Sequence, residues 1–418
     1  MFGTERTGVV LKYYLYKALG SPGFYMPIYV LYLLSNGVSY TQIGLIGTIQ
    51  SAVTIGGEIP TGYVGDRIGR RNSLLVAQVA YVIAVAGFIV STDFVGFALS
   101  FALFSFATTF VSGSDQAWLY DILTERLDED TFTRVQGRGA AIRQWVMAVT
   151  MILGGLLYAL DHVYPFLAGF VMRAATFAVI LWMPTNAQYE RDEGETTDGD
   201  RLTILDALPI VREKLTGPSL RWFVAFVALF YGARLTATSY IQPIVVETMR
   251  STFGAVLGTV GVPEVAALGL LYASFTAVSG IASDHADTLE AALGVRRSLL
   301  AVPVITCLLF VVPAFVPAAA FLMFFVARSS RSLLGPIVGQ YLNDRIASVG
   351  RATVSMVYAL ARMPFMIGSG AIADAYSPLV AVASLGGFFL VVGVGLFLGL
   401  DPVRSDSEAS AAQPAAAE

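Results

Sequence analysis

Apolar runs of about 20 residues recur along almost the whole chain, separated by short polar loops. A helix rises about 1.5 Å per residue, so each run suits a helix that crosses the roughly 30 Å hydrocarbon core of a membrane. Of the 418 residues, 56% are hydrophobic and 13% are charged, about half the charge of a soluble domain. We therefore expect an all-α membrane protein with about twelve spanning helices. The runs lie at residues 10–34, 41–64, 73–92, 94–121, 138–160, 163–184, 220–247, 262–282, 297–316, 318–342, 351–374 and 378–400.

A polar segment at residues 185–219 divides these runs into six and six. It is expected to be a cytoplasmic linker that contains a short amphipathic helix. The linker joins an N-terminal six-helix bundle at residues 1–184 to a C-terminal six-helix bundle at residues 220–400. The tail at residues 401–418 is rich in Ser, Ala, Pro and Glu, a composition typical of disordered chain.

Positively charged residues are concentrated in alternate loops. The loops expected on one face carry many of them, including Arg67, Arg134, Arg201 and Arg345, whereas the opposite loops carry only Arg250. Positive loops stay on the cytoplasmic side of a membrane, so we expect a multi-pass protein of the cell membrane with both termini and the linker inside the cell. Scarce lysine and acidic loops are typical of a halophile or of a prokaryote with a GC-rich genome.

The loop between the second and third runs carries a recognisable pattern. Residues 62–71 read Gly-Tyr-Val-Gly-Asp-Arg-Ile-Gly-Arg-Arg, which closely resembles the cytoplasmic signature of the major facilitator superfamily, Gly-x-x-x-Asp-Arg-x-Gly-Arg-Arg/Lys. The resemblance implies a secondary transporter in which two six-helix bundles give alternating access to a site at their interface. A simple positively charged turn is the alternative interpretation. The expected gate residues here are Gly62 for close helix approach, Gly69 for a tight turn, and Asp66, Arg67, Arg70 and Arg71 for a latch.

A degenerate second copy of this pattern lies between the eighth and ninth runs. The chain reads Gly280-Ile-Ala-Ser-Asp284, and Gly294-Val-Arg296-Arg297 follows after an insertion of about eight residues. A repeat at this place supports duplication of one bundle. Asp284, Arg296 and Arg297 are therefore the expected counterpart of the first gate.

Several ionisable residues are expected inside the predicted spans, where charges are costly and usually functional. Glu58, Asp115, Asp121, Arg138 and Arg143 fall in the cytoplasmic third. The favoured interpretation is an inner gate in which the acids pair with Arg138 and Arg143. The alternative is that Glu58 or Asp115 binds a proton or a cation.

The ionisable residues near mid-membrane in the later runs are arginines. In the family that the chain resembles, the first, fourth, seventh and tenth helices line the central cavity. Arg234 falls on the seventh run, and Arg328 and Arg331 fall on the tenth. Because a guanidinium binds a carboxylate with two parallel hydrogen bonds, one interpretation of these residues is an anionic substrate. The other interpretation is capping of broken-helix carbonyls, or pairing with an acid. The other expected cavity residues are Tyr231, Gln242 and Lys17, and Arg173 has no role that the sequence explains.

The expected function is secondary active transport of a small solute, with an organic anion as substrate and H⁺ as the coupling ion if one is used. Efflux of amphipathic drugs is the first alternative, although the fifth run has Gly154-Gly155 where proton-driven drug antiporters of this superfamily carry Gly-Pro. An intramembrane enzyme or sensor is the remote alternative. The chain has no His-Glu-x-x-His pattern and no phosphate-binding glycine loop, so no catalytic residue, metal or cofactor is expected. The expected partners are the solute and the lipid bilayer, and no nucleic acid.

Overall fold

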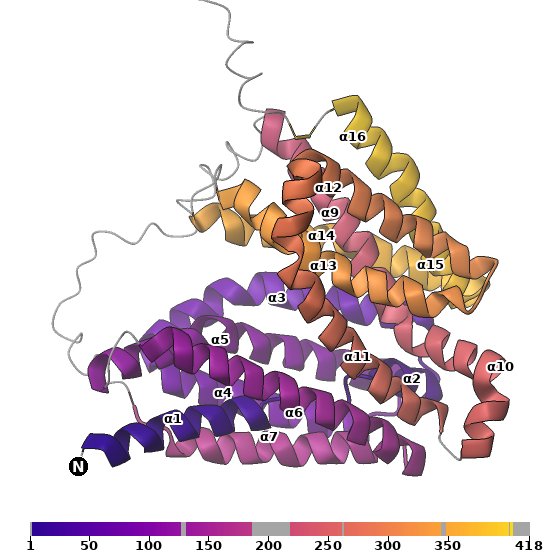
Figure 1. Ribbon diagram of the computed structural model, residues 1–418. Helices are drawn as coiled ribbons and strands as arrows, with labels where there is room; N and C mark the ends of the chain where they lie inside the picture. The colour runs from indigo at the N-terminus through magenta and orange to yellow at the C-terminus, as the bar shows by residue number, and fades with distance from the viewer. Residues whose placement is uncertain are drawn as a thin grey trace, which may run out of the picture. The chain divides into compact units, whose positions relative to one another are not determined.

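The computed structural model describes residues 2–126, 131–185, 218–260, 263–343, 348–400 and 402–403. Every regular element among these residues is a helix (Figure 1), which confirms the all-α prediction. The chain divides into two compact units: unit 1 is Met1–Arg201 with Val245–Thr276, and unit 2 is Leu202–Ile244 with Ala277–Glu418. The predicted linker and tail lie almost wholly outside the described residues.

Unit 1 is built mainly from the helices of the first half of the chain. Helix α4 packs against α5 and α7, α3 packs against α5, and α1 packs against both α6 and α7. Figure 1 shows α1, α6 and α7 side by side. The helices are α1 (Phe2–Leu19), α2 (Tyr29–Ser35), α3 (Tyr40–Ile68), α4 (Arg70–Val90), α5 (Phe94–Arg126), α6 (Phe132–Leu160) and α7 (Tyr164–Trp182), followed later in the chain by α10 (Ile241–Val260) and α11 (Glu264–Asp284), which unit 1 shares with unit 2.

The first predicted run is two helices rather than one. Gly20, Pro22 and Gly23 separate α1 from α2, because proline cannot continue a helical hydrogen-bond ladder and glycine is a poor helix former. A Cβ at Gly23 would collide with the Thr150 hydroxyl of α6. The turn is therefore pressed against α6, and glycine is needed there for the close approach.

Aromatic side chains form much of the interior of unit 1. Trp118 of α5 is fully buried and its ring stacks on Tyr13 of α1, with ring centroids 6.4 Å apart. At a second place the ring of Phe166 packs 4.3 Å from Tyr32 and 5.8 Å from Tyr25. Because lipid tails are as apolar as these side chains, such packing holds membrane helices together by van der Waals contact rather than by exclusion of water.

Unit 2 contains the other helices of the second half. Helix α9 packs against α14, and α12 packs against α13 and α15. Phe226 and Phe230 of α9 both pack on Phe389, with ring centroids 5.5 Å apart in each pair. The elements are α9 (Pro218–Ala237), the 3₁₀ turn Thr238–Tyr240, α12 (Ala286–Val311), the 3₁₀ turn Val312–Ala314, α13 (Ala319–Asn343), α14 (Ser348–Ala375), α15 (Pro378–Phe388), the π turn Phe389–Gly393 and α16 (Val394–Leu400).

Nine segments of the described chain are helical, long and apolar enough to cross a membrane. They correspond to nine of the predicted runs. The other three predicted runs correspond to α1 with α2, to α3 and to α14, which are helical but are not among the nine. A multi-pass helical protein is therefore supported, and the count of about twelve spans stays a prediction.

Candidate functional site

Two charged side chains are buried within the described part of the chain, and both are arginines. Arg173 of α7 in unit 1 is 6% exposed, and Arg234 of α9 in unit 2 is 5% exposed. Burying a guanidinium is costly unless its charge is balanced and its N–H groups are bonded. The surroundings of these two residues are therefore the first places to look for a site.

Arg234 has few fixed partners. Its Nη1 donates to the backbone oxygen of Ala327 on α13 at 3.1 Å. Its guanidinium carbon lies 5.7 Å from the ring centre of Tyr231, one turn earlier on α9. The Nε atom is buried and has no hydrogen-bond partner among the described residues. The Nε–H group is therefore a buried donor without an acceptor among the described residues.

Three more arginines lie near enough for their charges to act on Arg234. They are Arg328 and Arg331 of α13 and Arg362 of α14. Arg328 and Arg362 are half-buried, and Arg331 is exposed. We call Arg234 and these three residues the unit 2 arginine cluster. Like charges that lie close together repel one another, and a bound anion relieves that repulsion.

The aromatic residues beside this cluster come from the crossing of α9 and α14. Tyr231 meets Tyr358 edge to face, with centroids 5.4 Å apart. The Tyr358 hydroxyl is buried and has no hydrogen-bond partner among the described residues. A Cβ at Gly232 would lie 2.9 Å from the Phe365 ring, so the glycine lets α9 approach α14 closely. Gln242, another predicted cavity residue, is buried at the start of α10.

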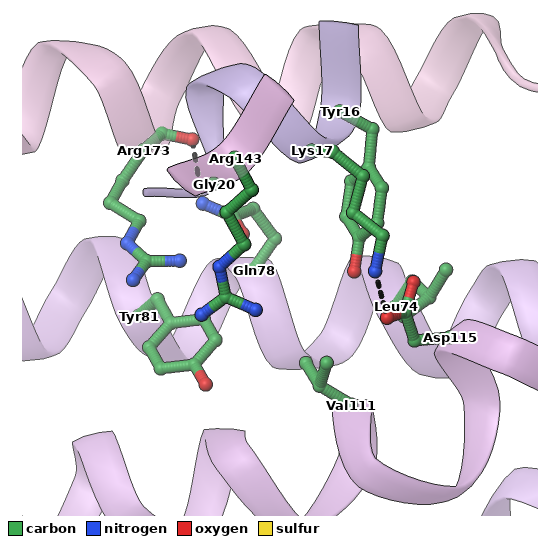
Figure 2. A pocket seen from close by; sticks show the side chains of 10 residues that line it. All are labelled: Tyr16, Lys17, Gly20, Leu74, Gln78, Tyr81, Val111, Asp115, Arg143 and Arg173. Atoms are coloured by element: carbon green, nitrogen blue, oxygen red, sulfur yellow. Dashed lines mark hydrogen bonds and ion pairs between the residues drawn. The ribbon is translucent and has the colours of Figure 1, made fainter. Parts of the chain in front are cut away.

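Unit 1 contains a small polar cavity between its helices (Figure 2). Its volume is about 60 Å³, which is room for a few water molecules and too little for a whole metabolite. We call it the unit 1 cavity. It is lined by Tyr16, Lys17, Gly20, Leu74, Gln78, Tyr81, Val111, Asp115, Arg143 and Arg173.

An ion pair lies on one side of the unit 1 cavity. Lys17 Nζ of α1 donates to Asp115 Oδ2 of α5, and the two side chains are 12% and 15% exposed. The ammonium group also lies 5.3 Å and 5.6 Å from the ring centres of Tyr13 and Tyr16. The second carboxylate oxygen, Asp115 Oδ1, is buried without a hydrogen-bond partner among the described residues.

Arg173, for which the sequence suggested no role, lies on the other side of the same cavity. Its guanidinium stacks over Tyr81 at 4.2 Å and donates to the Tyr25 hydroxyl at 3.3 Å. Gln78 donates to its backbone oxygen at 2.7 Å, as Figure 2 shows. Its Nε has no hydrogen-bond partner in the described structure. Cation–π contacts thus take the place of a carboxylate partner.

For Asp115, the expected inner-gate pairing is not what the structure shows. Asp115 pairs with Lys17 rather than with Arg138 or Arg143, because α1 presents a cation to that face of α5. Arg143 is exposed but lines the unit 1 cavity, whereas Arg138 is exposed and does not. Lys17, expected beside the arginines of the seventh and tenth runs, belongs to unit 1. Of the other acids in the expected gate, Glu58 is exposed and Asp121 is half-buried.

In the motif at residues 62–71, Arg71 caps the end of helix α7. Arg71 Nε donates to the backbone oxygen of Ile180 at 3.1 Å, and its Nη2 donates to that of Leu181 at 2.5 Å. A cation at the last carbonyls of α7 is favourable because these groups have no helical partner and carry the negative end of the helix dipole. Arg67 stacks on Tyr63 at 4.4 Å. The side chain of Asp66 lies outside the described residues.

Close helix approach occurs at Gly65 rather than at Gly62. A Cβ at Gly62 would meet no described atom within 4 Å, whereas a Cβ at Gly65 would lie 2.8 Å from the Ser73 hydroxyl of α4. The tight turn expected at Gly69 is present, because Gly69 has φ 88° and ψ 150° between α3 and α4.

The second copy of the motif has the same turn. Gly294 has φ 74° and ψ 162° and kinks α12. Aligning it with Gly69 places Arg296 opposite Arg71, and the buried pair Ser298-Leu299 opposite the buried pair Ser73-Leu74. Residues 286–293 form a short helix before the kink, which explains the insertion of about eight residues. Asp284 ends α11, and Arg296 and Arg297 are exposed.

The comparisons with known proteins agree with this architecture. The profile of the Major Facilitator Superfamily matches residues 18–353. An uncharacterized MFS-type transporter, YxaM of Bacillus subtilis (strain 168), is 25% identical over 260 residues, which are 61% of this chain and 60% of the relative's length.

Two solved structures share the fold. The crystal structure of nucleoside transporter NupG superposes with a TM-score of 0.77 at 12% identity, covering 95% of this chain and 98% of that one. A point mutant of NupG gives a TM-score of 0.70 at 13% identity, covering 94% and 99%. At such low identity the likeness concerns the fold alone.

Proposed function

Because the chain belongs to the Major Facilitator Superfamily, we propose that it is a secondary transporter that moves a small organic anion across the cell membrane by alternating access. Proteins of this family transport solutes rather than catalyse reactions. The substrate, its charge and the coupling ion are the proposed part.

The unit 2 arginine cluster is the observation that supports an anion. Arg234 is 5% exposed, and the charges of the three other arginines of the cluster act on it. An anion would reduce the repulsion among these like charges, a neutral solute would not, and a cation would add to it. A carboxylate or phosphate group would accept hydrogen bonds from the guanidinium while the rings of Tyr231 and Tyr358 pack against its apolar part.

Two other substrate classes deserve a place in the same test. Nucleosides are included in the test because a nucleoside transporter shares the fold. A neutral nucleoside, however, has no charge for the four arginines to bind. Amphipathic cationic drugs are included because many exporters belong to this family. Their positive charge is repelled by that of the cluster. Neither class is favoured by the charges around Arg234.

The test is solute flux in proteoliposomes that contain the purified full-length protein. A panel of labelled organic anions, nucleosides and cationic dyes is compared, with and without an inward proton gradient. We expect saturable uptake of at least one anion, inhibited by other anions and accelerated by the proton gradient. Flux confined to nucleosides or dyes would overturn the anion assignment, and flux of no solute would overturn transport itself.

The membrane topology and the gates belong to the same proposal. We propose twelve spans with both termini inside the cell, and gates formed by the motif at residues 62–71 and by its second copy at Asp284, Arg296 and Arg297. The one cysteine, Cys307, is buried, so a single introduced cysteine can be labelled selectively. In intact cells a membrane-impermeant maleimide should label Asp93→Cys and should leave Asn72→Cys unlabelled; the reverse pattern would invert the topology.

A further inference from the structure

A second cavity in unit 1 lies where helices α2 and α6 end. Its volume is about 470 Å³, which is within the usual range of sites that bind small organic molecules. It shares no lining residue with the unit 1 cavity. We call it the α2–α6 cavity. Its polar lining residues are Tyr32, Ser35 and Asn36 near the end of α2, and Tyr158, Asp161 and His162 near the end of α6.

The charge in the α2–α6 cavity is negative. Asp161 is the one carboxylate that lines it, and no lysine or arginine does. No described cation forms an ion pair with Asp161. Asp161 directly follows Leu160, the last residue of α6. Because the C-terminal end of a helix carries partial negative charge, the helix end and the carboxylate both attract a cation.

The hydrogen-bond donors on the α2 side of this cavity are directed into the protein. The Tyr32 hydroxyl donates to the backbone oxygen of Phe88 at 3.1 Å. Ser35 Oγ and Asn36 Nδ2 both donate to the backbone oxygen of Tyr32, at 2.9 Å and 2.8 Å. A ligand that needs hydrogen-bond donors from the protein, such as an anion, therefore finds few on this side.

The end of α6 presents acceptors instead. The backbone oxygens of Ala159 and Leu160 and the Oδ2 atom of Asp161 accept no hydrogen bond from the part of the chain that the structure describes. The start of α7 adds little donor capacity, since the Tyr164 N–H donates to the backbone oxygen of Asp161 at 3.2 Å and Pro165 has no N–H. A positively charged group that donates hydrogen bonds matches this set, and an alkylammonium group is both.

Tyr158 and His162 provide an aromatic wall. Their rings stack with centroids 4.4 Å apart and an interplanar angle of 16°. Tyr158 is buried, whereas His162 is exposed. Because Tyr158 covers one face of the imidazole, the other face is open to a flat or apolar group of a ligand.

We propose that the α2–α6 cavity binds a small organic ammonium ion, with its ammonium group at Asp161 and its apolar body against the ring of His162. A bare metal ion would fill only a small part of about 470 Å³. The ligand is opposite in charge to the solute proposed for the unit 2 arginine cluster, so it is a second ligand and not the transported one. In the proposed topology the cavity faces the outside of the cell; that placement rests on the proposed function, whereas binding does not.

The experiment uses three compounds that share one ring and differ in charge: benzylamine, benzyl alcohol and benzoate. Ser35 is exposed and lines the cavity, and Cys307 is buried, so the Ser35→Cys protein has one reactive thiol. A neutral methanethiosulfonate reagent modifies this thiol in the purified full-length protein in detergent. The buffer is weakly alkaline, which keeps an alkylamine protonated and imidazole neutral. The ligand concentration that halves the modification rate measures affinity at this cavity alone.

Benzylamine should protect Ser35→Cys saturably, at a concentration about tenfold or more below that of benzyl alcohol, since both the carboxylate and the helix end favour the charge. Benzoate should not protect. Asp93→Cys lies at an exposed residue outside the cavity, and benzylamine should leave its modification rate unchanged. Absence of protection by benzylamine, or equal protection by the three compounds, would overturn the proposal without any further variant.

Variants in the Ser35→Cys background assign the ammonium position. Asp161→Asn should weaken protection by benzylamine about three- to fivefold. Asn keeps an oxygen that can accept from the Val163 N–H, as Asp161 Oδ1 does at 2.8 Å. Asp93→Asn is the matched control, because Asp93 Oδ1 accepts from the Gly96 N–H in the same way, at 2.8 Å, but does not line the cavity. Unchanged protection in Asp161→Asn would place the ammonium elsewhere and contradict the site.

Two variants of His162 test the aromatic wall. His162→Ala should weaken protection by benzylamine about two- to tenfold, and His162→Phe, which keeps a ring, should restore it. Equal protection in both variants would refute the contact with the ring. These tests are separate from transport: a failed ammonium site leaves the proposed anion transport untouched, and absence of solute flux leaves the ammonium site untouched.

Discussion

Gly69 and Gly294 hold nearly the same backbone conformation, with φ and ψ of 88° and 150° at the first residue and 74° and 162° at the second. Only glycine adopts this region without strain. Each turn is followed by arginine and then by a buried Ser-Leu pair. The two halves of the chain therefore share this turn.

Replacing either glycine should destabilise the protein. Gly69→Ala and Gly294→Ala each force a side chain into a strained conformation that costs about 1–3 kcal/mol. The measurement is thermal unfolding of the purified protein in detergent. Gly62→Ala is the control, because a Cβ there meets no described atom within 4 Å, and its unfolding temperature should equal or exceed that of the wild type. If Gly69→Ala and Gly294→Ala unfolded at the same temperature as Gly62→Ala and the wild type, the two turns would carry no strain.

Gly139 and Gly137 provide a matched pair on α6. A Cβ at Gly139 would lie 2.6 Å from the Tyr13 ring and 3.3 Å from Lys17 Cγ, whereas one at Gly137 would meet nothing within 4 Å. Gly139→Ala should therefore cost about 1–3 kcal/mol through overpacking and should displace Lys17. Thermal unfolding measures the cost, which Gly137→Ala should not show. A harmless Gly139→Ala would mean that α1 and α6 are not packed this closely.

Arg173→Met tests whether the buried guanidinium stabilises the fold. Removal of a buried charge that is held by rings rather than by an acid should change stability by about 1 kcal/mol or less, since the lost cation–π contact offsets the desolvation that is relieved. Arg173→Ala should cost about 2–5 kcal/mol because it leaves a cavity. Chemical or thermal unfolding separates the two variants. A Met variant as unstable as the Ala variant would show that the charge itself is structural.

Arg71→Gln should loosen the end of α7. Two hydrogen bonds from a guanidinium to helix-terminal carbonyls would be lost at a partly exposed site, at a cost of about 1 kcal/mol. Thermal unfolding again measures this cost. Arg134→Gln, at an exposed residue of α6, serves as the control and should unfold like the wild type. Equal unfolding temperatures of Arg71→Gln and Arg134→Gln would argue against this capping contact.

The sequence predicted the helical architecture well because its signals are local. Apolar runs of spanning length and the glycine-rich motif at residues 62–71 can be recognised without knowing the packing. The tight turn at Gly69 follows from residue type for the same reason. The break between α1 and α2 was missed because the apolar pattern continues across Gly20 to Gly23.

The partners of the charged residues could not be predicted in the same way. Position within a run estimates depth in the membrane but not the face of the helix. Lys17 and Asp115 are 98 residues apart in the chain, and nothing local connects them. The sequence assigned no role to Arg173 for the same reason, since its partners are the ring of Tyr81 and the hydroxyl of Tyr25, which are distant in the chain. Only tertiary packing brings these groups together.

The initial rate of anion uptake into proteoliposomes tests the proposed function most directly when Arg234→Gln is compared with Arg221→Gln. Both residues lie on α9, but Arg221 is exposed and stacks on Trp222. At low substrate concentration, Arg234→Gln should lower the rate about 10- to 100-fold, which corresponds to the loss of a charged hydrogen bond of about 1.5–3 kcal/mol. Arg221→Gln should transport like the wild type. Wild-type uptake by a folded Arg234→Gln variant would contradict an anion site at this arginine cluster.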